Sequence, residues 1–185
     1  IGDYTIDKVR QLARKFHLPA VSKIPESQEV CFIPSTTNDF LSRYLKLKHG
    51  KIVDKNGKVL GQHQGLALYT IGQRKGIGLS GGPYYVMKKV QKKNLLVVTK
   101  NQRDLYQKEA LLNNVNWLSG SKPKLPLRLK AKIRYRHSLA WSVISKLKTK
   151  KYKLVFDKPQ LAVTPGQSAV FYRGEELLGG GIIEK

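Results

Sequence analysis

One ten-residue stretch constrains the fold of this chain more strongly than any other. In residues 127–136, Leu, Leu, Ala, Ile and Tyr alternate one by one with Arg, Lys, Lys, Arg and Arg. A period of two puts the apolar side chains on one face of a β-strand and the basic side chains on the other. The stretch therefore predicts a strand with one apolar and one basic face.

Further strand signals fill the chain after residue 50. Two hairpins are predicted, one with Asn56-Gly57 at its turn and one that turns through residues 91–94. Many short strands separated by turn signals predict a small closed or nearly closed barrel, which would resemble the barrels of translation factors. The hairpin strands are expected at residues 51–54, 58–61, 84–87 and 95–98, and the other strands at 141–147, 152–156, 169–172 and 181–183.

The first part of the chain has helical periodicity instead. Residues 4–17 predict a helix that Thr5 can cap. A shorter helix is predicted over residues 39–47, with Asn38 or Asp39 as its cap. Both predictions rest on apolar residues spaced three and four apart.

These patterns predict a mainly β chain in three parts. A helical and loop segment over residues 1–49 carries Cys31, and a small central β-rich domain follows over residues 50–118. A C-terminal β-barrel that binds RNA is expected over residues 119–185. The boundary between the two β parts is placed at residues 119–126, which are rich in Ser, Gly, Lys and Pro.

The charge balance points to a polyanionic partner. The chain has 35 Lys and Arg residues against 12 Asp and Glu, which gives a net charge of +23. RNA is the first candidate, and the alternative is a Lys-rich surface that is merely solvated. A membrane surface is disfavoured, because the basic residues lie in strand-like segments and no apolar run approaches the roughly 20 residues that span a bilayer. The single cysteine excludes an internal disulfide and favours a cytoplasmic location, and no metal-binding spacing is found.

The local sequence around Cys31 allows three interpretations. Free cysteines are most often small buried hydrophobes. A reactive thiolate needs positive charge nearby, and the nearest charges, Glu26 and Glu29, disfavour it, with Lys23 as a possible counterweight. A hydrolase with a Cys–His pair is a third reading, but nothing pairs any of the four histidines with Cys31.

A glycine-rich segment follows a small polar cluster. Residues 76–81 match the pattern G-x-G-x-x-G, but a strand is predicted after it, where a dinucleotide site requires a helix. Just before it, Gln73, Arg74 and Lys75 could hold phosphates. The alternative is a solvated basic turn.

The end of the alternating strand combines arginines with an aromatic ring. Arg134 and Arg136 are expected to be exposed, because guanidinium groups pair with phosphates. The alternation places Tyr135 in the core. Gln167 lies in a Thr-Pro-Gly-Gln turn, and its amide can both donate and accept hydrogen bonds.

Six segments, read together and in order, carry a specific resemblance. They are residues 26–34 around Cys31, residues 61–66 (Gly-Gln-His-Gln-Gly-Leu), 69–78 (Tyr-Thr-Ile-Gly-Gln-Arg-Lys-Gly-Ile-Gly), 134–136 (Arg-Tyr-Arg), 162–172 and 178–183. The set is similar to the tRNA-specific 2-thiouridylase family and covers essentially the whole chain.

The resemblance implies an activity and a set of site residues. In that family an N-terminal nucleotide-binding domain uses ATP, with Mg, to adenylate the wobble uridine of certain tRNAs. A sulfur-carrier protein loads a cysteine as a persulfide, and a second cysteine releases the sulfur by forming a disulfide. By this resemblance Cys31 is the persulfide cysteine, and Arg134, Tyr135 and Gln167 contact tRNA. The segment over residues 1–49 is then the end of the catalytic domain or a linker.

Two departures from the family pattern limit these expectations. The ATP-binding loop and the second cysteine are absent, so this chain is expected to be inactive alone and to bind no cofactor itself. The usual motif around the persulfide cysteine also differs here at Gln28, Glu29, Val30 and Pro34, while Ser27 fits. The alternative function is a stand-alone RNA-binding barrel in which Cys31 is inert.

Overall fold

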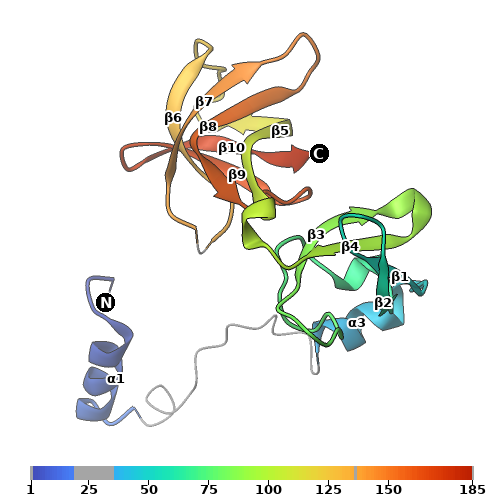
Figure 1. Ribbon diagram of the computed structural model, residues 1–185. Coiled ribbons are helices and arrows are strands. Elements are labelled where there is room, and N and C mark those ends of the chain that lie inside the picture. The colour runs from blue at the N-terminus through green and yellow to red at the C-terminus, as the bar shows by residue number, and fades with distance from the viewer. Residues whose placement is uncertain (1, 19–35, 136, 185) are drawn as a thin grey trace. The chain divides into compact units, whose positions relative to one another are not determined.

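The computed structural model describes residues 2–18, 36–135 and 137–184, and its ribbon is shown in Figure 1. The chain is mainly β, as predicted. It divides into two compact units, Ile1–Leu45 and Lys46–Lys185. Among the described residues, no helix has both the length and the apolar character required to cross a membrane.

The first unit contains two short helices. Helix α1 (Ile6–Lys15) begins after Thr5, whose hydroxyl accepts a hydrogen bond from the Lys8 amide at 3.4 Å, as the sequence predicted. Helix α3 (Thr37–Tyr44) begins earlier than predicted. Its cap is Thr36 rather than Asn38 or Asp39, because Thr36 and Asp39 form a reciprocal capping box.

The second unit begins with a four-stranded sheet in the order β2-β1-β4-β3. Both predicted hairpins are present, β1 with β2 and β3 with β4. The parallel pairing of β1 with β4 was not predicted, because nothing local in the sequence encodes a contact between distant strands. The elements are β1 (Gly50–Val53), β2 (Val59–His63), the 3-10 turn η1 (Leu66–Leu68), β3 (Tyr85–Val90), η2 (Gln91–Lys93), β4 (Leu95–Thr99) and η3 (Gln102–Leu105).

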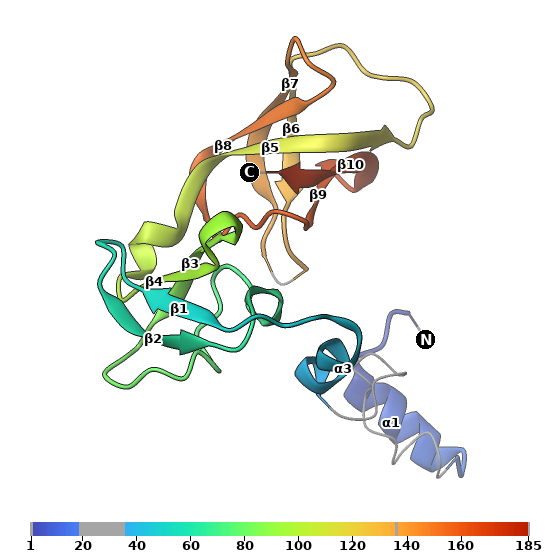
Figure 2. The ribbon, with the colours of Figure 1, turned by 90° about the vertical axis from the view of Figure 1, so that its right-hand side faces the viewer.

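Six further strands close into a barrel in the order β10-β5-β8-β7-β6-β9. Figure 2 shows β5 running beside β8, with which it pairs in antiparallel fashion. Closure leaves no unpaired strand edge and confirms the predicted barrel. The strands are β5 (Tyr106–Trp117), β6 (Leu127–Lys132), β7 (Ala140–Lys146), β8 (Tyr152–Leu161), β9 (Ser168–Arg173) and β10 (Glu176–Glu184).

The barrel begins earlier in the chain than the predicted boundary at residue 119. Residues 106–117 were placed in the central domain and no strand was predicted there, but they form β5, which pairs with both β8 and β10. The polar segment over residues 119–126 therefore connects two strands of one barrel. A long connection rich in Ser, Gly and Pro has the same composition whether it lies within a domain or between two domains, so composition misplaced the boundary.

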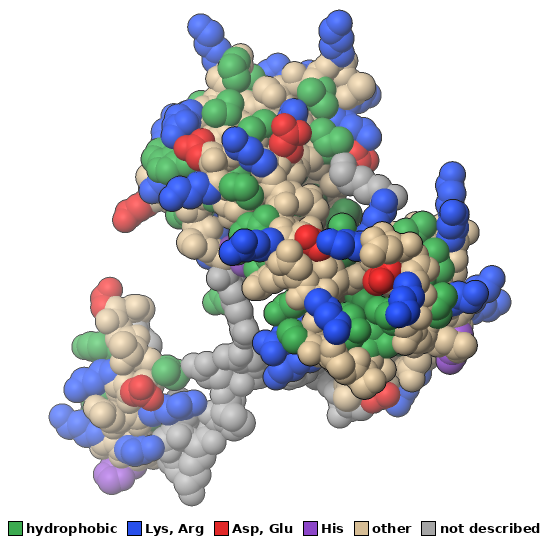
Figure 3. Space-filling view, in the orientation of Figure 1, with side chains coloured by type: hydrophobic (Ala, Val, Ile, Leu, Met, Phe, Trp, Pro, Cys, Tyr) green, Lys and Arg blue, Asp and Glu red, His purple; other side chains and the backbone are tan. Residues whose placement is uncertain are grey.

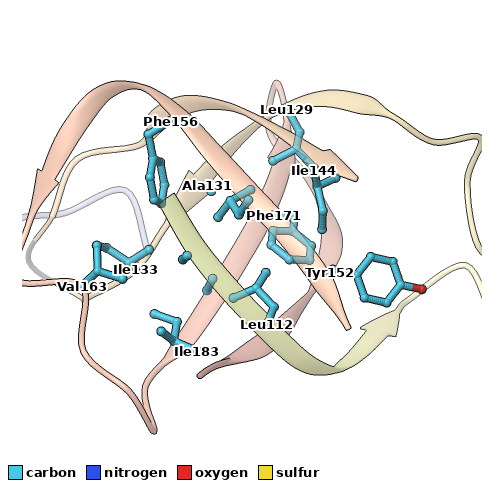
Figure 4. Close-up of a cluster of buried hydrophobic side chains, with 13 residues drawn as sticks. Leu112, Leu129, Ala131, Ile133, Ile144, Tyr152, Phe156, Val163, Phe171 and Ile183 are labelled. Carbon is cyan, nitrogen blue, oxygen red and sulfur yellow. The ribbon is translucent and has the colours of Figure 1, made fainter. Parts of the chain in front are cut away.

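The barrel core is filled from the inner faces of all its strands. Leu112, Ile144, Leu154 and Phe171 are completely buried. Figure 4 labels Leu112, Ile144 and Phe171, whose side chains converge in the barrel interior. In β6, Leu129 and Ala131 are buried while Arg128, Lys130 and Lys132 reach solvent, so the predicted alternation is confirmed over this strand.

The glycines of β10 allow the barrel to close. A Cβ atom at Gly180 would lie 2.8 Å from the carbonyl oxygen of Ala169 on β9, and one at Gly179 would collide with the carbonyl oxygen of Asn116 on β5. Only a residue without a side chain permits both neighbours to approach so closely. The Gly-Gly-Gly sequence therefore serves strand pairing.

Candidate nucleic-acid interface

A broad open groove of about 960 Å³ lies where β6 ends and β9 begins. Its walls include Lys132, Arg134, Tyr135, His137 and Gln167. Figure 3 shows Lys and Arg side chains scattered over the visible face of the barrel, with few Asp or Glu side chains among them. The groove thus brings together the three residues that the resemblance assigned to tRNA contact.

The sequence predicted that Arg134 is exposed, and this prediction is wrong. Its side chain is partly buried and forms hydrogen bonds within the protein. Its Nε donates to Gln167 Oε1 at 2.9 Å. Its Nη2 donates to the carbonyl oxygen of Ile71 and to Thr164 Oγ1, both at 2.7 Å. Burial lowers the pKa of Arg134, yet a guanidinium stays charged at any physiological pH. Arg134 is thus a fixed cation at the groove wall.

The interpretation that Tyr135 points into the core is wrong, because its side chain is 91% exposed. Strand β6 ends at Lys132, and a turn follows in which the His137 amide donates to the Arg134 carbonyl at 3.1 Å. The turn breaks the period of two, so alternation no longer decides where Tyr135 points. The Lys132 ammonium lies 5.7 Å from the centre of the Tyr135 ring, within cation–π range.

Gln167 is held by its backbone and by Arg134. Its backbone amide donates to the carbonyl oxygen of Thr164 at 3.2 Å, and its backbone carbonyl oxygen accepts from the Ile183 amide of β10 at 2.7 Å. Because Arg134 occupies Oε1, the side-chain orientation is fixed with Nε2 as the remaining group. Nε2 can only donate, and it has no hydrogen-bond partner among the described residues.

The segment before the glycine-rich loop separates into structural and exposed residues. Gln73 Oε1 accepts from the Thr70 amide and its Nε2 donates to the Lys75 carbonyl, both at 2.9 Å, so this side chain organises the turn. Arg74 and Lys75 are exposed. Thr70 also lines the groove, and Arg134 binds the carbonyl of Ile71, so this turn adjoins the groove.

The glycine-rich pattern itself is a loop, as predicted. Residues 76–81 are irregular, and strand β3 follows where a dinucleotide site would have a helix. Within the part of the chain that the structure describes, no three His, Cys, Asp or Glu side chains are grouped as metal ligands. Cys31 and Arg136 both lie outside the described residues.

His137 is a second titratable group of the groove whose pKa is displaced, after Arg134. Burial is the larger cause and the positive charge of Arg134 is the second, and both lower the pKa. The imidazole is therefore neutral at neutral pH. As a neutral ring it can donate from one nitrogen and accept at the other.

One residue beside this groove was not singled out from the sequence. Trp141 was identified only as part of a strand, yet it is exposed and lies opposite Lys130 in the β6–β7 register. The alternation of exposed and buried residues along β7 indicates that Trp141 faces outward. Reading that signal required the pairing of β6 with β7.

Comparisons with known proteins agree with this architecture. The family described as "tRNA methyl transferase PRC-barrel domain" matches residues 38–100, and the one described as "Aminomethyltransferase beta-barrel domain" matches residues 107–183. The second match begins at β5, where the barrel begins in the structure.

Curated relatives match across the whole chain. The tRNA-specific 2-thiouridylase MnmA of Rippkaea orientalis is 44% identical over 187 residues, which cover 100% of this chain and 53% of the relative. The protein of the same name from Carboxydothermus hydrogenoformans is 44% identical over 192 residues, with 100% and 51% covered. The chain spans about half the length of the curated relatives it matches, and it belongs to the family of tRNA-specific 2-thiouridylases.

Proposed function

We propose that this chain is the tRNA-binding part of an enzyme that replaces the 2-oxygen of the wobble uridine in tRNA with sulfur. The observation that carries the proposal is full-chain similarity to tRNA-specific 2-thiouridylases. The net charge of +23 and the groove around Arg134, Tyr135 and Gln167 support contact with a polyanion. Tyr135, with its exposed ring, is suited to stack on a base.

The proposed role of Cys31 is to carry the sulfur as a persulfide, delivered by a sulfur-carrier protein in the cytoplasm. ATP, with Mg, held by a nucleotide-binding domain of the same protein, would supply an adenylyl group to the uridine 2-oxygen, with pyrophosphate as the leaving group, and so make that oxygen a good leaving group. The terminal sulfur of the persulfide then attacks C2, and AMP departs with the oxygen. A second cysteine thiolate attacks the Cys31 sulfur, which breaks the S–S bond, leaves the sulfur on C2 and joins the two cysteines in a disulfide.

The groove residues divide the work of binding. Arg134 is proposed to present a fixed positive charge, and Gln167 a single donor, toward the sugar-phosphate backbone. Arg74, Lys75 and Arg136 are proposed to add further phosphate contacts. Gln73 is proposed to contribute indirectly, because its side chain holds the turn that presents Arg74 and Lys75.

The test is 2-thiouridine in tRNA from cells that lack the gene, rescued with wild-type protein or with Cys31→Ser. The thionucleoside is measured by mass spectrometry of digested tRNA. Rescue by wild type and not by the serine variant is the expected outcome.

Each of the other outcomes has a distinct meaning. Failure of both proteins to rescue would contradict the enzymatic proposal and favour an RNA-binding barrel without chemistry. Rescue by both would keep the enzyme and remove Cys31 from the reaction.

A further inference from the structure

A row of three side chains crosses the outer face of the barrel beside the groove. In the β9–β6–β7 register, Tyr172 pairs with Lys130, and Lys130 pairs with Trp141. Their neighbours along the strands, Phe171 and Ser142, are buried, so the row itself faces outward. Tyr172 also lines the groove, which makes the row continuous with it.

Two cations lie within cation–π distance of the ring of Trp141. The guanidinium carbon of Arg128 and the ammonium nitrogen of Lys130 each lie 5.1 Å from the ring centre. The side chain is nevertheless 49% exposed. Indole is the best of the aromatic rings for cation–π contact, so the two cations orient it while half of its surface stays open.

We propose that Trp141, with Arg128 and Lys130, is a stacking platform for an unpaired nucleotide of the bound tRNA. The exposed indole accepts a base, and the two cations take the phosphates on either side of it. This inference rests on the proposed function and adds to it a binding surface outside the groove. It extends the tRNA path from Tyr135 and Lys132 across β6 to β7.

The charge of the surroundings favours RNA as the occupant. Asp157 is the acidic partner on this face, and its carboxylate holds Arg128 at 2.8 Å. That ion pair is exposed to solvent at both ends and weak, so a phosphate can replace the carboxylate. Lys130 and Lys132 keep the rest of the row positive.

The test measures the affinity of the intact protein for a tRNA transcript by fluorescence anisotropy. Trp141→Ala is expected to weaken binding about 5- to 150-fold, the range for one lost base stack. Trp141→Leu should lose as much, because it keeps apolar bulk without a ring, and Trp141→Phe should restore most of the affinity. Tyr106→Ala is the matched control, because Tyr106 is also 49% exposed and lies on β5, away from the row.

Salt dependence separates stacking from charge. Trp141→Ala should leave the slope of affinity against salt concentration unchanged, whereas Arg128→Ala should reduce the slope by about one phosphate contact. Unchanged affinity of Trp141→Ala, or equal losses in the Phe, Leu and Ala variants, would overturn the platform.

Binding of the wild-type protein to the transcript distinguishes a wrong platform from a wrong proposed function. If it does not bind the transcript, the proposed function fails first. If it binds and only the Trp141 variants behave as wild type, the platform alone is wrong. Melting temperatures of all variants identify any loss that comes from unfolding.

Discussion

The barrel carries two clusters of cations and rings that look alike in sequence and differ in structure. The guanidinium of Arg134, beside Tyr135, donates hydrogen bonds to three acceptors within the protein. Arg128 and Lys130, beside Trp141, face solvent and contact the ring. The first cluster holds a cation by hydrogen bonds beside an exposed ring, whereas the second holds a half-exposed ring against two cations that reach solvent. A basic residue near an aromatic one therefore has no single meaning.

The largest expected effect is the loss of folding stability when Arg134, in the first cluster, is replaced. Arg134→Ala should lower the free energy of unfolding by about 3 kcal/mol, because charged hydrogen bonds contribute about 1.5–3 kcal/mol each and three acceptors lose their donor. The melting temperature should fall by roughly 6–12 °C. Arg134→Lys keeps the charge without the planar fork and should recover only part of the loss.

Thermal unfolding followed by circular dichroism checks this expectation. A variant as stable as wild type would mean that the three hydrogen bonds contribute nothing net. Arg134 would then be a free cation like Arg128, and the contrast between the clusters would disappear.

A second, smaller effect locates the stability within the first cluster. Thr164 is buried, accepts from Arg134 Nη2 and donates to the carbonyl of Ala162. Thr164→Val should cost about 1–2 kcal/mol. The double variant with Arg134→Ala should cost less than the sum of the two, by about 1 kcal/mol, because the shared hydrogen bond is lost only once. Strict additivity in urea unfolding would show that the two residues act independently.

The sequence predicted most of the strands from local alternation, but it did not predict β5. Residues 127–133 alternate in the structure as they do in the sequence. Alternation failed at Tyr135 because a turn begins there, and a turn changes where the next side chain points. The buried role of Arg134 depends on Ile71, which lies 63 residues away, so no local pattern could have predicted it.

The candidate site was also predicted where the signal is local and missed where it depends on contacts between strands. Arg134, Tyr135 and Gln167 were chosen by resemblance, and the structure gathers them at one groove. Trp141 was missed because its neighbours come from β6, and the register between β6 and β7 is not written in either strand alone. Sequence patterns identified residue types, and strand pairing decided which of them share a surface.

Acid should destabilise the part of the barrel around Arg134 through its neighbour His137. Burial and the charge of Arg134 hold the pKa of His137 below its ordinary value of 6.5. The unfolded chain therefore takes up a proton that the folded barrel resists, and stability falls as the pH drops through 6.5 until the lower, folded pKa is reached. His137→Gln should show a flatter dependence across that window, measured by urea unfolding at several pH values. An equally steep decline in the variant would place the acid sensitivity elsewhere.

The smallest expected effect on stability belongs to the second cluster. Arg128→Ala removes an ion pair with Asp157 and a contact with Trp141, both at the surface. Exposed pairs contribute about 0–1 kcal/mol, so the melting temperature should change by no more than roughly 4 °C. A loss as large as that of Arg134→Ala would show that Arg128 is structural. Near-wild-type stability would show that the fold does not depend on Arg128, which is the property that separates it from Arg134.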